Sequence, residues 1–468
     1  MFVYKFIHLL SVFLISFVLG LMIVFLPVKL LFSFIIILSL VVLVFFQPWM
    51  VFVMVLGLVS GLDLPGFIPV FGAVRLSDIF LLLSVLFFIL FFRENFQKNS
   101  KSIEPVAIPC FMYVLVVIAS CFVAYVFFGT ELRQIFGELK HQLYWLLLPM
   151  FAVMVVENGV YKKTLILMLV IGLIASMLQI IQGIFGVQLS SSVGTYQVAG
   201  IGGDSVLRTN IGKFIIIWTF LLLCSALFFR YISSRVALLP LVLTILGVLV
   251  TYGKSLWAGV FLAFIFLFIQ FNIKDQVVSV SKLLFIFLLL VIFVFLIKPE
   301  VFTSVIDRVM SVGEEIDSGY SLQWRIYENE RAIESIMNYP LGVGLGSAYR
   351  PQSVVDINVS DMVRYIHNSY YYMAVKLSGI GLFLFFLVMF RIAMLSVRFR
   401  KKLNAIAHKN QYNKFDIVIV SIYPPLLVGM LLYSIFTPSL MTSDGIAFLA
   451  VFSGIVLGRV WAFDGSKS

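Results

Sequence analysis

Continuous apolar stretches of about 15 to 24 residues recur along almost the whole chain, and they constrain its fold more than any other feature. With 62% hydrophobic and 12% charged residues, the chain carries more apolar surface than a water-soluble domain can bury. In lipid, only helices and closed barrels pair all of their backbone polar groups. Because the stretches are continuous and not alternating, we expect an all-α polytopic membrane protein with about 12 to 14 transmembrane helices.

The apolar stretches fall into two groups on either side of a hydrophilic segment. Residues 1–297 are expected to form about 11 transmembrane helices, and residues 368–468 about three more. Segment 29–61 forms either two helices or one kinked helix, because Gln47-Pro48 interrupts it. The first apolar run has no cleavage site after it, so we expect a membrane helix and not a cleaved signal peptide.

The hydrophilic segment 298–367 is the one loop large enough to fold on its own. It holds about ten acidic and about six basic residues, so it is not a general anion-binding surface. The spacing of its apolar residues predicts amphipathic helices at 300–312 and from Ser321 to Asn338. Pro340 is expected to end the second helix.

The distribution of basic residues indicates the orientation of the chain in the membrane. Segment 391–415 is rich in Lys and Arg and is therefore expected to be a loop on the cytoplasmic side. This places segment 298–367 on the outer side. The same rule accounts for the net charge of +11 without a nucleic-acid partner.

His367 is the histidine best placed for proton transfer. It lies where the large outer loop returns to the membrane, a position wet enough to titrate and ordered enough to position a hydroxyl. The alternative interpretation is an interfacial histidine that caps a helix beside three tyrosines. The sequence contains no Walker motif, no H-E-x-x-H and no Cys or His pair at zinc spacing, so we expect neither a metal nor a cofactor.

Basic residues at the outer helix ends form a second candidate group, since short outer loops are normally poor in Lys and Arg. The group is Arg133, Lys140, Arg208, Lys213 and Lys254. A diphosphate held at the membrane surface would account for these cations. The alternative is contact with lipid head groups, or ion pairs with Glu131 and Glu138.

Three glycines follow the second loop helix at alternate positions, Gly342, Gly344 and Gly346. They are weak evidence for a nucleotide loop, because no strand precedes them. We expect them to let the chain pass close to another backbone.

Taken in order, these features resemble the O-antigen ligase and O-antigen polymerase superfamily of bacterial lipid-linked glycan transferases. The resemblance rests on Arg325, the run from Pro340 to Gly346, His367-Asn368-Ser369 and Gly379-Ile-Gly381. Upstream, TYGKSLWAGVFLAFIF and GAVRLSDIFLLL resemble two further family segments. The specific part of the resemblance is residues 250–382.

The resemblance implies a GT-C-like, inverting membrane glycosyltransferase that works without a nucleotide sugar. The implied donor is a glycan on undecaprenyl diphosphate, and the implied acceptor is a second glycan, lipid A core or a protein. The implied location is the bacterial inner (cytoplasmic) membrane, with the active face periplasmic. By motif match, His367 would activate or orient the acceptor hydroxyl, whereas Lys254, Arg208 and Arg325 would bind the diphosphate. The family usually has Arg where this chain has Lys254, so the charge is kept but the bidentate geometry is lost.

Two other classes of function stay open at this point. A polysaccharide transporter or lipid-glycan flippase should carry ionisable residues near the middle of the membrane, and the apolar stretches here are nearly free of them. A non-catalytic assembly subunit would use the acidic outer loop to bind a partner. Within the glycosyltransferase reading, the sequence does not distinguish a ligase, a polymerase and a protein oligosaccharyltransferase, nor does it give the oligomeric state.

Overall fold

The computed structural model describes residues 76–91, 104–156, 158–185, 196–199, 205–208, 211–270, 320–350, 364–406 and 412–465, with a few isolated positions between 55 and 310. Most of the first 75 residues, including nearly all of segment 29–61, lie outside the described residues. The same is true of most of 271–319. The division of the chain at residues 297 and 367 therefore stays a prediction.

Helices account for almost all of the described residues. In chain order the elements are α4 (Leu76–Phe91), α6 (Glu104–Val126), α7 (Leu132–Leu143), η3 (Tyr144–Leu146), α8 (Leu147–Met154), α9 (Asn158–Phe185), β1 (Tyr196–Ala199), β2 (Ser205–Arg208), α10 (Lys213–Phe228), α11 (Ser234–Leu249), α12 (Lys254–Ile269), α15 (Tyr320–Asn338), α16 (Ser369–Ile406), α17 (Tyr412–Tyr433) and α18 (Ser443–Gly465). Within this part of the chain, α6, α9, α16, α17 and α18 are long and apolar enough to cross a membrane, and four shorter helices are also apolar. The expected polytopic helical membrane fold is confirmed.

One expectation about the loops was wrong, and one element was not expected. Segment 391–415 is not a loop throughout, because α16 continues to Ile406 and α17 begins at Tyr412. Arg and Lys are good helix formers, so a basic stretch can extend a helix beyond the lipid. In the large loop, the helix expected from Ser321 to Asn338 is present as α15, and the described residues of 300–312 are helical. The small antiparallel hairpin β1-β2 was not expected.

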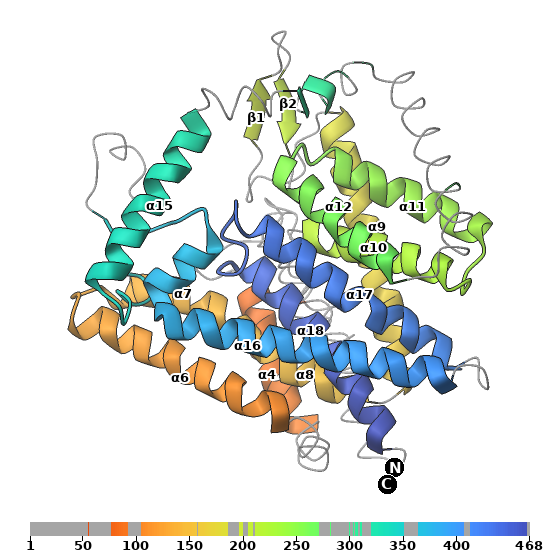
Figure 1. Ribbon diagram of the computed structural model, residues 1–468, viewed down its shortest axis with the longest axis horizontal. Coiled ribbons are helices and arrows are strands. Elements are labelled where there is room, and N and C mark those ends of the chain that lie inside the picture. Colours follow the sequence, from red (N-terminus) through yellow and green to blue (C-terminus); the bar gives the residue numbers. More distant parts are fainter. Residues whose placement is uncertain are drawn as a thin grey trace, which may run out of the picture.

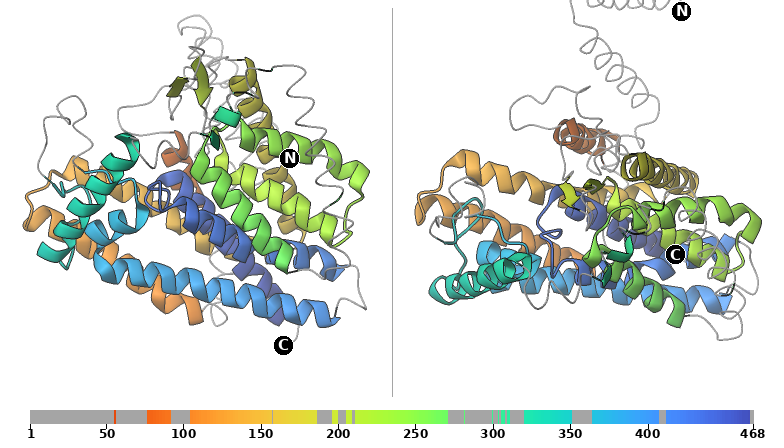
Figure 2. Two further views of the ribbon diagram at one scale, coloured as in Figure 1. Left: turned by 45° about the horizontal axis from the view of Figure 1, so that its top comes forward. Right: turned by 90° about the horizontal axis from the view of Figure 1, so that it is seen from above.

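Helices α17 and α18 are mostly buried, whereas α6 is mostly exposed. Helix α6 lies beside α16 at one edge of the helix body (Figure 1 and Figure 2). Small residues allow the closest contacts: a Cβ atom on Gly454 of α18 would meet Phe151 of α8, and one on Gly458 would meet the same helix at Ala152. Such contacts suit membrane helices, which attract one another by close packing and not by exclusion of water. The buried helices α17 and α18 therefore form the centre, and α6 forms part of the rim.

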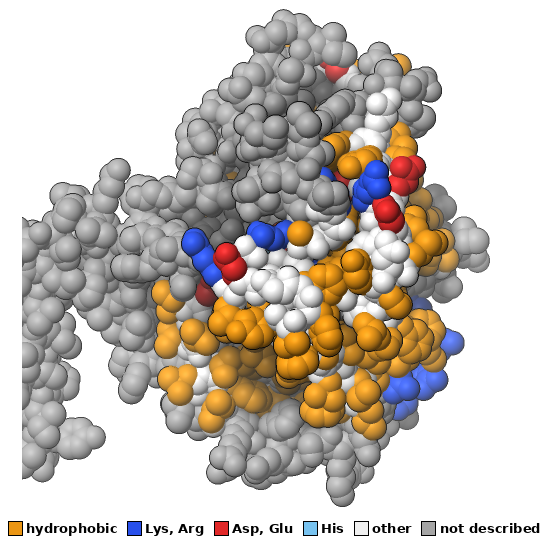
Figure 3. Space-filling model, turned by 90° about the vertical axis from the view of Figure 1, so that its left-hand side faces the viewer, with side chains coloured by type: hydrophobic (Ala, Val, Ile, Leu, Met, Phe, Trp, Pro, Cys, Tyr) orange, Lys and Arg blue, Asp and Glu red, His pale blue; other side chains and the backbone are white. Residues whose placement is uncertain are grey.

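The exposed side chains of the rim are apolar. In Figure 3, hydrophobic side chains cover a broad area, and charged side chains lie along its upper border and at its right-hand edge. Phe111 and Phe122 of α6 and Phe383 and Phe390 of α16 are all exposed. An apolar area of this extent is the surface that a membrane protein presents to lipid.

One end of the helix body gathers several helix ends and is called the site end below. Helices α12 and α17 cross in opposite directions, and Gly259 near the start of α12 lies against Tyr433 at the end of α17. Lys213 at the start of α10 lies over the ring of Tyr433. The start of α16 joins them, because the Ser369 amide donates to the Ser434 carbonyl (2.9 Å). The site end is thus the place where α10, α12 and α16 begin and α17 ends.

Candidate functional site

A buried carboxylate is in direct contact with His367. The Nδ1 atom of His367 lies 2.7 Å from Oε2 of Glu328, and the backbone amide of His367 donates to the same oxygen at 3.3 Å. The indole N–H of Trp324 donates to Oε1 of Glu328 at 3.0 Å. Trp324 and Glu328 are one turn apart on α15, so their side chains project from the same face of the helix and can contact each other. Glu328 therefore joins α15 to the start of α16.

The two members of this pair differ sharply in exposure. The Glu328 side chain is 1% exposed, whereas the His367 side chain is 29% exposed. A buried carboxylate is costly unless hydrogen bonds satisfy it. Here the indole N–H of Trp324 and the backbone N–H of His367 donate to its two oxygens, and Nδ1 of His367 lies at hydrogen-bond distance. The imidazole is therefore held on its Nδ1 side and is partly exposed. Tyr365 packs edge-on against the ring, with centroids 5.0 Å apart.

Asn368, and not His367, caps the helix that follows. The Oδ1 atom of Asn368 accepts the backbone amides of Tyr370 (2.9 Å) and Tyr371 (3.3 Å). This is the hydrogen-bonding pattern of a helix N-cap. The interpretation of His367 as a capping residue is therefore wrong, and its ring is left for other contacts.

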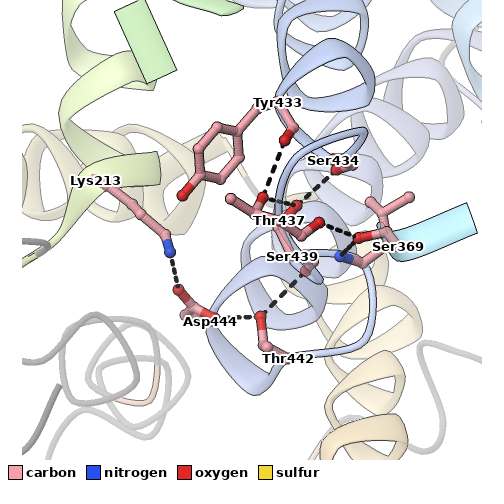
Figure 4. Close-up of polar contacts among 9 residues, drawn as sticks. Lys213, Ser369, Tyr433, Ser434, Thr437, Ser439, Thr442 and Asp444 are labelled. Carbon is pink, nitrogen blue, oxygen red and sulfur yellow. Dashed lines mark hydrogen bonds and ion pairs between the residues drawn. The ribbon is translucent and has the colours of Figure 1, made fainter. Parts of the chain in front are cut away.

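The start of α16 is also tied to the turn between α17 and α18. The Ser369 hydroxyl donates to the Thr437 carbonyl at 2.6 Å and accepts the Leu440 amide at 3.1 Å. Figure 4 shows these bonds as part of a polar network that reaches across the site end. The backbone that carries His367 is thus fixed on the α17 side by Ser369 and on the α15 side by Glu328.

The same network contains one of the outer lysines. Lys213 Nζ lies 3.2 Å from Asp444 Oδ2, and Thr442 donates to the other oxygen of Asp444 at 2.6 Å (Figure 4). The ammonium group also lies over the rings of Phe214 and Tyr433. Lys213 therefore connects the start of α10 to the start of α18, and it contributes no net charge to the site end.

Lys140 has a similar tie. Its Nζ atom lies 3.7 Å from Asp78 of α4, and the Tyr144 hydroxyl donates to the same carboxylate at 2.9 Å. For Lys140 and Lys213 the ion-pair interpretation therefore holds, with different acids from the two expected. Of those two, Glu138 pairs with Lys376, a residue that the sequence analysis did not single out.

The glycine run positions α15 against the rest of the site. The φ angles of Gly342, Gly344 and Gly346 are +81°, +84° and +79°. A Cβ atom on Gly344 would lie 2.6 Å from the Ala124 amide, and one on Gly346 would lie 2.6 Å from the Ile135 amide. The run passes between α6, α7 and α16, as close-approach glycines were expected to do. No side chain would fit at these positions.

A buried ion pair holds the residue after this run. Lys376 of α16 is fully buried, and its Nζ atom donates to Glu138 Oε1 at 3.0 Å and to the Ser347 carbonyl. The Ser347 hydroxyl in turn lies 2.7 Å from that of Thr130. Lys376 therefore locks the glycine run onto α7 and α16. The contact thereby fixes the segment that follows α15, which carries Glu328, against α16, which begins just after His367.

Lys254 lies at the site end, at the first position of α12. It is five residues before Gly259, whose Cβ position is 3.5 Å from the Tyr433 Cβ atom. Since Ser434 accepts the Ser369 amide, Lys254 and His367 lie at the same end of the helix body. Lys254 is partly exposed and also occupies a helix N-terminus, where free backbone amides and the helix dipole favour an anion.

Arg325 and Arg208 have no contact that ties them directly to His367 among the described interactions. Arg325 is partly exposed on α15, three residues before Glu328, and three-residue spacing puts both on one side of the helix. Arg208 is the last residue of β2, opposite Tyr196 in the hairpin. It precedes Lys213 by five residues, so its Cα atom lies within about 18 Å of the start of α10. The structure brings Lys254 to the end that carries His367. Arg325 lies on α15, which contacts His367 through Glu328, and Arg208 lies in β2, five residues before Lys213.

Sequence reasoning missed Glu328 and Lys376. Glu328 lies 39 residues from His367, and only the fold of the intervening loop brings them together. One signal was present: Glu328, Ala332 and Ser335 have the spacing of a single helix face, and an acid on a face of small residues needs a partner. Lys376 carried the equivalent signal, as a lone charge in an apolar stretch.

Comparison with known proteins points to one family. Residues 239–389 match the family model described as O-antigen ligase, which supports assigning the chain to the O-antigen ligase and polymerase family. The matched segment contains Lys254, Arg325, Glu328 and His367, whereas Arg208 lies before it. No curated protein matches the chain.

Proposed function

We propose that this chain belongs to the O-antigen ligase and polymerase family and transfers a glycan from undecaprenyl diphosphate to an acceptor hydroxyl, with inversion at the anomeric carbon. The observation that carries the proposal is the partly exposed His367 ring, held on its Nδ1 side by a buried acid at the end of the helix body where Lys254 lies. A base beside cations suits an acceptor hydroxyl that attacks a sugar diphosphate.

The proposed reaction is a single displacement. The acceptor oxygen forms a bond to the anomeric carbon, and the bond from that carbon to the diphosphate oxygen breaks. The hydroxyl proton goes to Nε2 of His367, and the bonding electrons leave with the diphosphate. Attack from the face opposite the leaving group inverts the anomeric centre. Because diphosphate is already a good leaving group, stabilising its charge is a large part of the catalytic work.

The cationic part of the site is assigned to Lys254, Arg208 and Arg325. Lys254 offers a point charge next to the amides at the start of α12, and both groups favour phosphate oxygens. Lys213 is not assigned this role, because Asp444 neutralises it. The diphosphate would lie at a helix start near the membrane surface, which suits a donor anchored by a lipid chain.

The site end is proposed to face the periplasm in a bacterial inner (cytoplasmic) membrane. Helix α16 starts at the site end and, 22 residues later, begins a basic stretch that runs to its far end. That stretch contains Arg391, Arg398, Arg400, Lys401 and Lys402. Basic residues favour the cytoplasmic side, so the opposite end faces outward.

The test is glycan transfer by purified protein in proteoliposomes that contain the lipid-linked glycan and an acceptor. His367→Ala and Lys254→Gln are expected to lower turnover by at least 10²-fold while the protein still inserts normally. Lys401→Gln, an exposed lysine at the far end of α16, is the matched control and should retain activity. Full activity of His367→Ala would contradict the proposed chemistry. Movement of the lipid-linked glycan across the bilayer without transfer would indicate a flippase instead.

Deletion in the native host would identify the acceptor. Surface glycans reduced to single units would indicate a polymerase, and a bare lipid core would indicate a ligase. Loss of glycan from proteins alone would indicate a protein oligosaccharyltransferase.

A further inference from the structure

We infer that Glu328 is the positioning residue for His367: it holds the imidazole as the Nδ1–H tautomer, so that Nε2 is the atom that takes the acceptor proton. The inference deepens the proposed function and rests on it for the identity of the reaction. The state of the imidazole in the resting protein does not depend on that reaction.

The hydrogen bonds assign the tautomer. An ionised carboxylate can only accept, so the proton between Glu328 Oε2 and His367 Nδ1, 2.7 Å apart, belongs to the imidazole. The other donors to this carboxylate are the indole of Trp324 and the backbone amide of His367. Both of these groups can only donate, so the surroundings of Glu328 are complementary to an acceptor. In neutral imidazole, protonation of Nδ1 leaves the lone pair on Nε2.

Glu328 also fixes the direction of the ring. The Oε2 atom of Glu328 contacts both the backbone amide and Nδ1 of His367. Rotation of the imidazole away from this position would therefore break a hydrogen bond to a buried acid. Leaving that acid unsatisfied is costly, because it is 1% exposed. The ring orientation is therefore set by the docking of α15 and not by His367 alone.

A purely structural role explains the pair less well. Glu328, Ala332 and Ser335 form the buried face of α15, and an apolar residue at position 328 could bury that face without the cost of a charge. What the carboxylate adds is a negative charge 2.7 Å from Nδ1, on the ring whose Nε2 atom takes the hydroxyl proton. When Nε2 takes the hydroxyl proton, the imidazole becomes positive and Glu328 stabilises it.

The first test separates this role from binding and folding. Glu328→Gln keeps the shape and removes the charge, and it is expected to lower kcat by about 10²-fold with KM for the lipid-linked donor unchanged. Glu328→Asp should restore part of kcat. In the His367→Ala background, Glu328→Gln should have no further effect, because residues that act as a unit are not additive. Glu330→Gln, an exposed acid on the same helix, is the control.

Three results would overturn the inference: full kcat in Glu328→Gln, an effect on KM alone, or a further loss in the His367→Ala background. Thermal unfolding of each purified variant identifies loss of fold as a separate cause.

The second test needs no activity. In full-length protein labelled with ¹⁵N-histidine, NMR at a pH where the ring is neutral should show His367 protonated at Nδ1, with the signal assigned by its loss in His367→Asn. Protonation at Nε2 would overturn the inference even if glycan transfer is found. Protonation at Nδ1 would support it even if reconstituted protein transfers no glycan, in which case the proposed function alone fails.

Discussion

Gly259 of α12 and Gly429 of α17 lie back to back, so close that a Cβ atom on Gly259 would be 2.7 Å from the Gly429 carbonyl oxygen. The reciprocal distance, from a Cβ atom on Gly429 to the Gly259 oxygen, would be 2.6 Å. This contact sets how far α12 approaches α17. It therefore sets where Lys254 lies relative to the residues that follow Tyr433.

Gly259→Ala should separate these two helices. The added methyl group has no room, and forcing it into a packed contact costs about 1 to 3 kcal/mol. The variant should unfold at lower temperature or lower denaturant concentration in detergent, and its glycan-transfer activity should fall. Gly137→Ala in α7 is the matched control, because nothing lies within 4 Å of its Cβ position. Equal stability of the two variants would contradict the contact.

Lys254→Arg should keep most of the activity that Lys254→Gln loses. Arg keeps the positive charge at the start of α12 and adds the bidentate geometry that suits phosphate. The measurement is turnover at saturating lipid-linked donor for both variants. Equal loss in both would show that the residue contributes its shape and not its charge.

Asp416→Ala should destabilise the end of the helix body opposite the site. Asp416 accepts from Nε (3.0 Å) and a terminal nitrogen (2.9 Å) of Arg459, and this guanidinium also lies 4.2 Å from the ring of Tyr161. Removing the acid leaves a buried charge unpaired, which costs about 3 to 5 kcal/mol. Denaturant titration in detergent measures the loss.

The control for that variant is Glu334→Ala. Glu334 forms an exposed pair with Arg331 at 2.7 Å on α15, and surface pairs of this kind add little to stability. No measurable change is expected. If Glu334→Ala lost as much stability as Asp416→Ala, burial of the ion pair would not be the reason for the loss in Asp416→Ala.

Lys376→Met should disturb catalysis through the glycine run. The substitution leaves Glu138 without the ammonium group 3.0 Å away and frees the Ser347 carbonyl. Because the run sets the register of α15 on α16, kcat should fall more than donor affinity. Adding Glu138→Gln removes the unpaired charge and should recover part of the stability. A double variant less stable than either single variant would contradict the pairing.

Asn368→Ala should weaken the start of α16. It removes the oxygen that accepts the amides of Tyr370 and Tyr371, which costs about 1 kcal/mol at a helix N-cap. Asn368→Ser should retain most of the stability, because Ser is also a good N-cap residue. Thermal unfolding of the two variants tests this, and an Asn368→Ser variant as unstable as Asn368→Ala would argue against capping.

The membrane fold and α15 could be read from the sequence because each depends on local periodicity. An apolar run of sufficient length has one stable form in lipid, and the spacing in α15 repeats over about five turns. Glycine alternation likewise predicted a close approach of backbones, since positive φ angles are accessible to glycine at little cost. The extension of α16 to Ile406 was not predicted. Basic residues indicate where a helix leaves the lipid, but they do not indicate where the helix ends.

By itself the sequence determined that the chain folds in lipid as helices, that a polar loop precedes His367, and that cations cluster near helix ends. Only the tertiary structure decided which of those cations are neutralised by acids, and that Glu328 meets His367 across 39 residues of chain. The physical reason is the range of the interactions. Periodicity and transfer into lipid act over a few neighbouring residues, whereas the pairing of buried charges depends on which helices come into contact.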